Sequence, residues 1–372
     1  MQMKLIHTGD WHLGKIIYSR SMLDEQKGFI YDFFIPLIER ETPDAVIIAG
    51  DIFDRSIAPP EAIKLFDGFI SYISGKGIPL LAITGNHDGR ERITLGAQLL
   101  KKSGIYIATD LKDAFEPVSI GNLNFYLIPH IEPAQVREYF QNDEIRGFSD
   151  SYKAVTDKIY EDIDDSAVNI AVSHCFLNGC TISESEAPMY IGGSAQISSD
   201  LFDRFKLVLL GHLHSPQRAG DNGYYSGSPL KYSFDEQRQK KGVNIFELKD
   251  GEFERRFEPH SPIHDMRTIS GEFDSLLEQA KLNPSEDYIH IHLQDKKPIF
   301  MPMQRLREYY PNALELSTEL LPSPGNVTAA PTRRSFGEPS DVFREFSSQI
   351  CAQEATNEDL ELFEKIVREA LE

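Results

Sequence analysis

Five short segments of the chain carry carboxylate, amide and imidazole side chains at spacings that suit metal binding. They contain seven candidate ligands: Asp10, His12, Asp51, Asn86, His174, His212 and His214. Oxygen and imidazole donors without thiolate favour Mn²⁺, Fe²⁺ or Zn²⁺ over Ca²⁺ or Mg²⁺. This set is too large for one tetrahedral zinc ion, and it suits two ions that share one carboxylate. The pattern therefore predicts a two-metal centre.

Each segment follows an apolar run that is typical of a buried strand. The first three runs cover residues 4–8, 45–49 and 80–83. Helical patterns lie between them, at about 25–41 and 59–74. This alternation favours parallel strands in an α/β sheet. Because loops at the carboxyl ends of parallel strands converge, we expect the ligands to meet there. The two-residue spacing from Asp10 to His12, and from His212 to His214, directs both side chains to one face of an extended segment.

The order of these segments resembles the calcineurin-like metallophosphoesterase superfamily over roughly residues 1–260. Its pattern of D-x-H, G-D, G-N-H-[DE], H and G-H-x-H is matched at every position. The resemblance implies one ion held by Asp10, His12, Asp51 and His214. It implies a second ion held by Asp51, Asn86, His174 and His212, so that Asp51 bridges the two. His87 would then be the catalytic histidine, which faces the substrate and assists the leaving group.

This arrangement is suited to phosphoester hydrolysis. Two neighbouring cations can clamp a phosphate and lower the pKa of a water molecule, which gives a nucleophile near neutral pH. His87 could protonate the leaving oxygen. Two further carboxylates leave alternatives open. Asp88 could orient His87 or lie on a loop surface, and Asp54 could accept a hydrogen bond from a metal-bound histidine or cap a loop.

Further motifs are similar to the SbcD family, the nuclease subunits of bacterial SbcCD complexes. The similar segments are 7–15, 50–54 with Pro59, and 225–229 followed by 233–236. In that family a small α/β capping domain follows the phosphoesterase core, and a C-terminal helical segment binds SbcC, an ABC-type ATPase. The corresponding ranges are 1–262 for the nuclease domain, 263–321 for the capping domain, 322–339 for a linker and 340–372 for the partner-binding segment.

The predicted fold class is therefore α/β. It comprises a metallophosphoesterase core with mixed sheets flanked by helices, the small α/β capping domain and a helical tail. Residues 321–340 are rich in Pro, Ser, Gly and Thr, which is typical of a linker. The tail has two amphipathic patterns, which could dock on a partner or fold back on the body.

The charge of the chain bears on its partners. Lys and Arg number 38 and Asp and Glu number 58, so 38 − 58 gives a net charge of −20. Such an acidic protein repels nucleic acid unless bound cations or a partner offset the repulsion. Five basic residues beside the metal segments are candidate DNA contacts: Lys15, Arg20, Arg55, Arg90 and Arg92.

Composition also bears on location. The three cysteines form no C-x-x-C pair, which fits a reducing cytosol. We expect no membrane association, because the chain lacks an apolar run of about 18 residues. The first ten residues lack the apolar stretch of a signal peptide. A cytoplasmic protein is expected.

The metal motifs and the family resemblance together predict a Mn²⁺-dependent DNA double-strand exonuclease and single-strand/hairpin endonuclease subunit that acts with an SbcC-type ATPase in DNA repair and recombination. Two alternatives remain, a metallophosphoesterase for nucleotides or phosphoproteins and a non-enzymatic scaffold on the same fold. The resemblance also implies a homodimer within a heterotetramer, paired through residues 60–72 and 93–100. The apolar residues available there could instead face their own sheet: Phe66, Phe69, Ile70, Leu95 and Leu99.

Overall fold

The computed structural model describes residues 3–94, 96–186 and 195–318, and in the C-terminal part residues 340, 343–344, 347 and 355–371. The chain divides into two compact units, Met1–Met266 and Arg267–Glu372. The expected boundary at 262 lies four residues before this division. The expected linker, 322–339, lies outside the described residues. Among the described helices, none is both long enough and apolar enough to cross a membrane.

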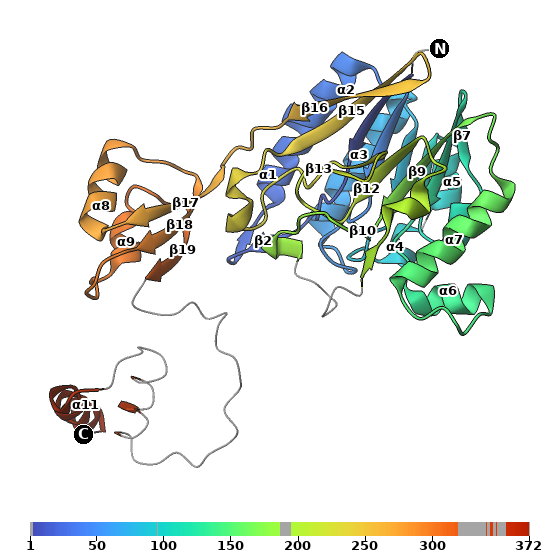
Figure 1. The fold of residues 1–372 in the computed structure, drawn as a ribbon. Helices are drawn as coiled ribbons and strands as arrows, with labels where there is room; N and C mark the ends of the chain where they lie inside the picture. Colours follow the sequence, from blue (N-terminus) through green and yellow to red (C-terminus); the bar gives the residue numbers. More distant parts are fainter. Residues whose placement is uncertain are drawn as a thin grey trace. The chain divides into compact units, whose positions relative to one another are not determined.

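The first unit contains two six-stranded sheets, which run through its centre (Figure 1). The first sheet has the order β16-β15-β1-β4-β5-β6. Its strands are β1 (Met3–Thr8), β4 (Ala45–Ala49), β5 (Leu80–Ile83), β6 (Ile105–Ala108), β15 (Gly242–Lys249) and β16 (Glu252–Pro259). Strands β1, β4, β5 and β6 are parallel, whereas β15 is antiparallel to β1. The sheet is therefore mixed, and three predicted strands form its parallel part together with β6.

The second sheet has the order β13-β14-β12-β9-β8-β7. Its strands are β7 (Val118–Ile120), β8 (Leu123–Ile128), β9 (Val168–His174), β12 (Leu207–Gly211), β13 (Gln217–Ala219) and β14 (Gly223–Tyr225). The four central strands are parallel, and the two edge strands are antiparallel to their neighbours. Two short ribbons complete the strands: β2 (Ile16–Ile17) with β3 (Arg20–Ser21), and β10 (Phe176–Leu177) with β11 (Gln196–Ile197).

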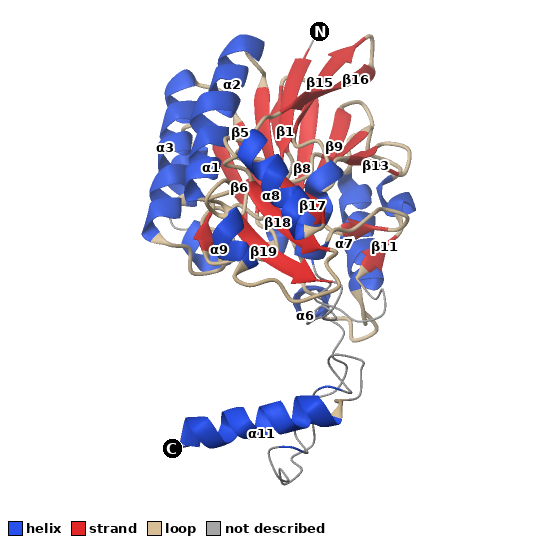
Figure 2. Cartoon of the chain, turned by 90° about the vertical axis from the view of Figure 1, so that its left-hand side faces the viewer, coloured by secondary structure: helices blue, strands red, loops and turns tan. Residues whose placement is uncertain are grey.

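The two sheets pack face to face over a shared apolar core. Leu5, Ile47 and Ile83 of the first sheet belong to one buried cluster with Phe125 and Val172 of the second. Each fully buried side chain of this size stabilises the fold by about 1.5–3 kcal/mol relative to an exposed one. Helices cover the outer faces (Figure 2): α3 (Pro60–Lys76) and the segment 23–41 on the first sheet, and α6 (Pro133–Phe140) and α7 (Phe148–Asp162) on the second.

The helical segment 23–41 changes its winding before a proline. It consists of α1 (Leu23–Gly28), a π-helical part, η1 (Phe29–Phe34), and α2 (Ile35–Glu41). Pro36 has no N–H and its ring disfavours a regular α-helical turn before it. In the wider turn the N–H of Ile35 instead donates to the carbonyl oxygen of Ile30. The chain thus stays helical through Pro36 and keeps its apolar face on the sheet.

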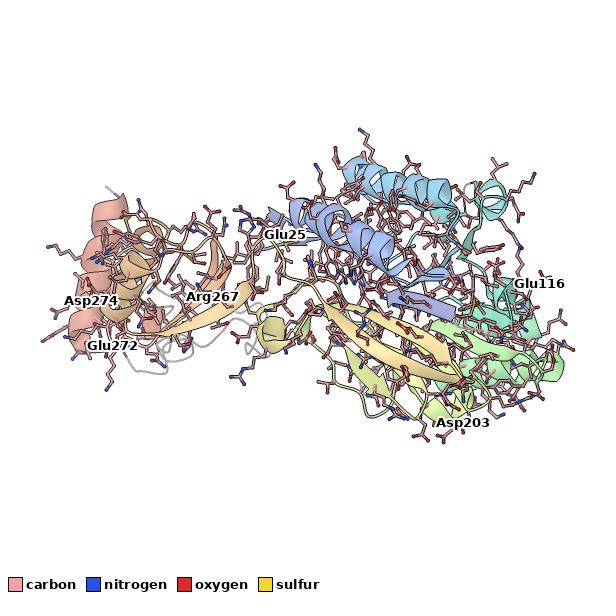
Figure 3. The ribbon with its side chains drawn as sticks, turned by 90° about the horizontal axis from the view of Figure 1, so that it is seen from above. Glu25, Glu116, Asp203, Arg267, Glu272 and Asp274 are labelled. Carbon is pink, nitrogen blue, oxygen red and sulfur yellow. The ribbon has the colours of Figure 1, made fainter. Side chains whose placement is uncertain are left out.

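The second unit contains a three-stranded sheet with the order β17-β18-β19. Its elements are β17 (Met266–Gly271), α8 (Phe273–Leu282), β18 (Tyr288–Leu293), α9 (Pro302–Leu306) and β19 (Ala313–Thr318). Phe273, Leu276 and Leu306 of the helices share a core with Ile289 and Ile291 of the central strand. Glu272 and Asp274 lie at the start of α8 (Figure 3), where carboxylates stabilise a helix N-terminus. The α/β character predicted for this part of the chain is confirmed.

The tail contains helix α11 (Asn357–Leu371). Its Phe363 ring stacks on Phe343, with the centroids 4.4 Å apart. Leu360 is buried, whereas Leu362 and Ile366 are exposed. Three apolar residues that the sequence places on the first tail helix, Val342, Phe346 and Ile350, lie outside the described residues. The described part therefore contains one amphipathic helix with part of its apolar surface uncovered.

Candidate metal centre

The seven predicted ligands meet at the carboxyl ends of parallel strands from both sheets. Asp10, Asp51 and Asn86 follow β1, β4 and β5, and His174 and His212 stand at the ends of β9 and β12. Four hydrogen bonds continue the β1–β4 pairing beyond the strands, among them Asp10 N–H to Gly50 at 3.0 Å and His12 N–H to Asp51 at 2.9 Å. The loops that carry the first ligands are therefore held together by their backbones.

Trp11 anchors the loop between the first two ligands. Its side chain is 1% exposed and packs edge-on against Phe29, Phe34, Phe66 and Phe69 of the covering helices. Its Nε1 donates to Thr8 Oγ1 at 2.9 Å. Trp11 thereby fixes the loop against the covering helices. Its neighbours Asp10 and His12 have left-handed backbone angles, with φ of 54° and 45°, so this segment is a tight loop and not the extended segment expected from the two-residue spacing.

At two of the glycines that precede candidate ligands, a side chain would not fit. A Cβ at Gly50 would collide with the His174 imidazole, and one at Gly85 would collide with the Asp51 carboxylate. Several ligands themselves adopt left-handed backbone angles, with φ of 54° at Asp10, 47° at Asp51 and 99° at His212. Such conformations cost on the order of 1–3 kcal/mol each and persist where the surrounding structure enforces them.

One group of donor atoms comes from Asp10, His12 and His214. One potential ligand atom from each lies within 4.8 Å of the others, and all three residues are buried. The Nε2 atoms of His12 and His214 are 3.1 Å apart. Asp10 Oδ2 is buried and has no hydrogen-bond partner among the described residues. A buried carboxylate oxygen without a partner beside two imidazoles fits a divalent cation.

The second group comes from Asp51, Asn86, His174 and His212. Asn86 Oδ1 lies 3.0 Å from His174 Nε2 and 3.1 Å from His212 Nδ1. Asp51 Oδ2 lies 3.3 Å from His174 Nε2 and 3.6 Å from His12 Nε2, so it faces both groups. The donor set fits two cations that share the Asp51 carboxylate.

Burial strongly perturbs the protonation of this cluster. Burial, together with the Asp51 charge, raises the pKa of Asp10 well above its usual range. Burial and the neighbouring His174 lower the pKa of His212 to about 3. Burial disfavours charge on His174 too, but the Asp51 and Asp10 carboxylates outweigh it and raise its pKa to about 9. Bound cations would favour ionised carboxylates and neutral imidazoles instead.

His87 lies beside the candidate ligands and lines a cavity together with several of them. Its ring packs edge-on against His12, with the centroids 4.8 Å apart. The ring Nδ1 of His87 is 2.8 Å from the Asp54 carbonyl oxygen. The backbone N–H of His87 donates to Asp51 Oδ1 at 2.9 Å. Donation from Nδ1 to the carbonyl fixes the ring and leaves Nε2 for a substrate.

Asp88 and Asp54, for which the sequence left two roles open, both contact loop residues near the candidate ligands. Asp88 is buried and accepts hydrogen bonds from the N–H groups of Ile52, Phe53 and Gly85. It therefore organises the loops through their backbones, rather than orienting the His87 ring or lying on a surface. Asp54 Oδ1 accepts from Lys15 Nζ at 2.9 Å and lies 3.7 Å from His12 Nδ1.

The five candidate DNA-binding residues differ in their surroundings. Lys15 is paired with Asp54, and Arg90 donates to the carbonyl oxygen of His130 and to Gln135. Arg55 is exposed and lies 3.5 Å from Asp54 Oδ2. Arg92 lines a second cavity, of about 200 Å³, with Phe66, Ile70 and Leu100. Arg20 lies on the exposed strand β3.

A cavity of about 260 Å³ opens beside the cluster, and its walls include residues that the sequence did not single out. His130, Phe148, Phe176, Ser185 and Glu186 line it together with ligands and His87. Behind His214 lie Glu236 and Lys241, which are buried. The motif 233–236 was a signal for Glu236. Ser185 and Glu186 lie in a short 3₁₀ helix, η3 (Glu184–Glu186), in a polar stretch with no recognisable motif, so only the fold identifies them.

Comparisons with known proteins agree with this geometry. A family model of calcineurin-like phosphoesterases matches residues 3–216, and this is the class that the paired sheets and their oxygen and imidazole donors define. A second model, described as the type 5 capsule protein repressor C-terminal domain, matches residues 262–350. The SbcD subunit of the nuclease SbcCD from Staphylococcus saprophyticus is 35% identical over 373 residues, covering 100% of this chain and 99% of the relative. The chain belongs to the SbcD family, as its motifs predicted.

Proposed function

We propose that this chain is the nuclease subunit of an SbcCD-type complex and hydrolyses DNA phosphodiester bonds at the candidate metal centre. The observation that carries the proposal is the convergence of seven oxygen and imidazole donors, with Asp51 facing both groups, beside His87 and one cavity. The full-length similarity to a nuclease subunit supports DNA as the substrate.

The proposed cofactors are two Mn²⁺ ions. Asp10, His12, Asp51 and His214 would hold one, and Asp51, Asn86, His174 and His212 the other. When bound, the ions would polarise the scissile phosphate and lower the pKa of a water molecule. The donor chemistry supports this assignment, since imidazole and carboxylate together suit Mn²⁺.

The chain itself would supply positioning and proton transfer. His87, held through Nδ1 by the Asp54 carbonyl, would give a proton from Nε2 to the leaving oxygen. General acid catalysis of this kind contributes roughly 10²–10⁴-fold to a rate. Asp88 would keep the loops of Asp51 and His87 in register through its three backbone hydrogen bonds.

The proposed partners are an SbcC-type ATPase, DNA and a second copy of the chain. The tail would bind the ATPase, which is supported by the exposed Leu362 and Ile366 on α11. For self-association the described residues favour only part of the expected surface. Phe66 and Phe69 are buried in their own core, whereas Ile63 of α3 and Leu99 of α5 (Ala97–Lys101) are exposed; Leu95 lies outside the described residues.

The proposal is tested by cleavage of a labelled duplex with one hairpin end, in Mn²⁺, in Mg²⁺ and in EDTA. Cleavage in Mn²⁺ that is lost in EDTA and in His87→Ala is expected. Hydrolysis of a phosphomonoester but of no DNA, with or without the ATPase, would favour a nucleotide or phosphoprotein phosphatase. No turnover of either substrate despite bound metal would favour a scaffold.

A further inference from the structure

A buried polar network lies behind His214, on the side of its ring away from the other ligands. His214 Nε2 faces His12, whereas Nδ1 lies 2.7 Å from Ser185 Oγ. Ser185 Oγ in turn donates to Glu236 Oε1. Glu236 is 0% exposed, and its Oε1 is 3.5 Å from His214 Nδ1. Ser185 therefore connects a predicted metal ligand to a carboxylate that lies outside both ligand groups.

The donor and acceptor capacities of these groups set the direction of the two hydrogen bonds that join His214, Ser185 and Glu236. An ionised carboxylate only accepts, and a serine hydroxyl has one proton to donate. If that proton goes to Glu236, Ser185 Oγ must accept from His214, which places a proton on Nδ1. The Nε2 atom then carries a lone pair, which is the state that binds a cation.

Lys241 keeps Glu236 in the accepting state. Its side chain is buried, and Nζ forms an ion pair with Glu236 Oε2 at 2.5 Å. The same Nζ donates to the His214 carbonyl oxygen at 2.8 Å and to Ser228 Oγ at 2.9 Å. A buried ion pair with further hydrogen bonds is the setting in which a carboxylate can stay charged without water. Lys241 thus holds both ends of the network, the carboxylate and the backbone of His214.

We propose that Ser185, with Glu236 and Lys241 behind it, is a positioning residue that fixes the tautomer and orientation of His214 for metal binding. The inference rests on the proposed two-ion centre. It also distinguishes the two ions. His174 Nδ1 bonds to the carbonyl oxygen of Ala49 at 2.8 Å, which a side-chain substitution does not remove. Loss of Ser185 should therefore affect only the ion held with His214.

The test compares Ser185→Ala with Ser233→Ala. Ser233 Oγ also lies 2.9 Å from Glu236 Oε1 and contacts Asp235 Oδ1, so its one proton goes to a carboxylate in either case. Its bonds therefore reach carboxylates and not the His214 ring, which makes it a matched control. Calorimetric titration of the metal-free proteins with Mn²⁺ should show one of two binding steps weakened about 10–100-fold in Ser185→Ala. The other step, and both steps of Ser233→Ala, should stay within about twofold of the wild type.

A second readout does not involve the metal. In ¹⁵N-histidine NMR spectra of the metal-free protein, His214 should carry its proton on Nδ1, and Ser185→Ala should lose this preference. The signal is identified by its absence in His214→Gln. Unchanged tautomer and unchanged Mn²⁺ affinity in Ser185→Ala, or equal weakening in Ser233→Ala, would overturn the inference. Binding of fewer than two ions by the wild type would instead contradict the two-ion centre, and the NMR result would still decide the role of Ser185.

Discussion

Replacing Asp88 should separate the two loops that carry Asp51, the proposed bridging ligand, and His87, the proposed catalytic residue. Asp88 Oδ2 accepts from Ile52 N–H at 3.1 Å and Gly85 N–H at 2.9 Å, and Oδ1 accepts from Phe53 N–H at 2.9 Å. These donors belong to the loops after β4 and β5. The side chain is 8% exposed, so water does not readily replace it.

The magnitude follows from the donors that would lose their acceptor. A buried N–H without a partner costs about 1–3 kcal/mol. Asp88→Ala orphans three donors, so the free energy of unfolding should fall by about 3–6 kcal/mol if water reaches some of them. Asp88→Asn keeps one oxygen but turns an NH₂ group towards a donor, which should cost about 1–3 kcal/mol. Mn²⁺ affinity should fall in both variants, because Asp51 and Asn86 lie on the loops that come apart.

The assay is urea unfolding of the metal-free protein, followed by Mn²⁺ titration. Asp113→Ala is a matched control, since Asp113 Oδ2 accepts from the N–H groups of Thr109 and Asp110, both at 3.0 Å, outside the cavity at the metal centre. The control should lose some stability but no metal affinity. If Asp88→Ala does not fold, Asp88→Asn carries the test. Wild-type stability and wild-type Mn²⁺ affinity in Asp88→Asn would refute the reasoning.

Three further outcomes are expected. Asp51→Ala should lose both ions, because its carboxylate faces both donor groups; two ions per chain by elemental analysis would contradict this. Deletion of 340–372 should abolish co-purification with the ATPase while metal content stays at the wild-type level, and retained co-purification would exclude the tail as the docking segment. Neutralising Arg55 and Arg92 together should reduce the salt dependence of DNA binding, measured by anisotropy between low and moderate salt; an unchanged slope would remove both as phosphate contacts.

The folded structure places Phe66, Phe69 and Asp88 in surroundings that the sequence left open or predicted differently. Helical periodicity placed Phe66 and Phe69 on a pairing surface or on the sheet, and burial decides for the sheet. Asp88 was expected on a loop surface or beside His87 as its orienting group, and instead it binds loop backbones. Periodicity and residue type describe one element at a time, so they cannot say which face meets a neighbour that is distant in sequence.

The sequence by itself determined which side chains are candidate metal ligands and which strands precede them. Gly-Asp, Gly-Asn-His and Gly-His motifs after apolar runs predict a ligand set at strand ends. The glycines belong to this pattern because a side chain at Gly50 or Gly85 would overlap a predicted ligand. Only the tertiary structure decided which atoms face each other. His174 and His214 reach Asp51 and His12 because the second sheet packs on the first, and Ser185 reaches His214 across 29 positions of sequence. Those contacts depend on sheet packing and loop closure, which are long-range and leave no periodic signal in the chain.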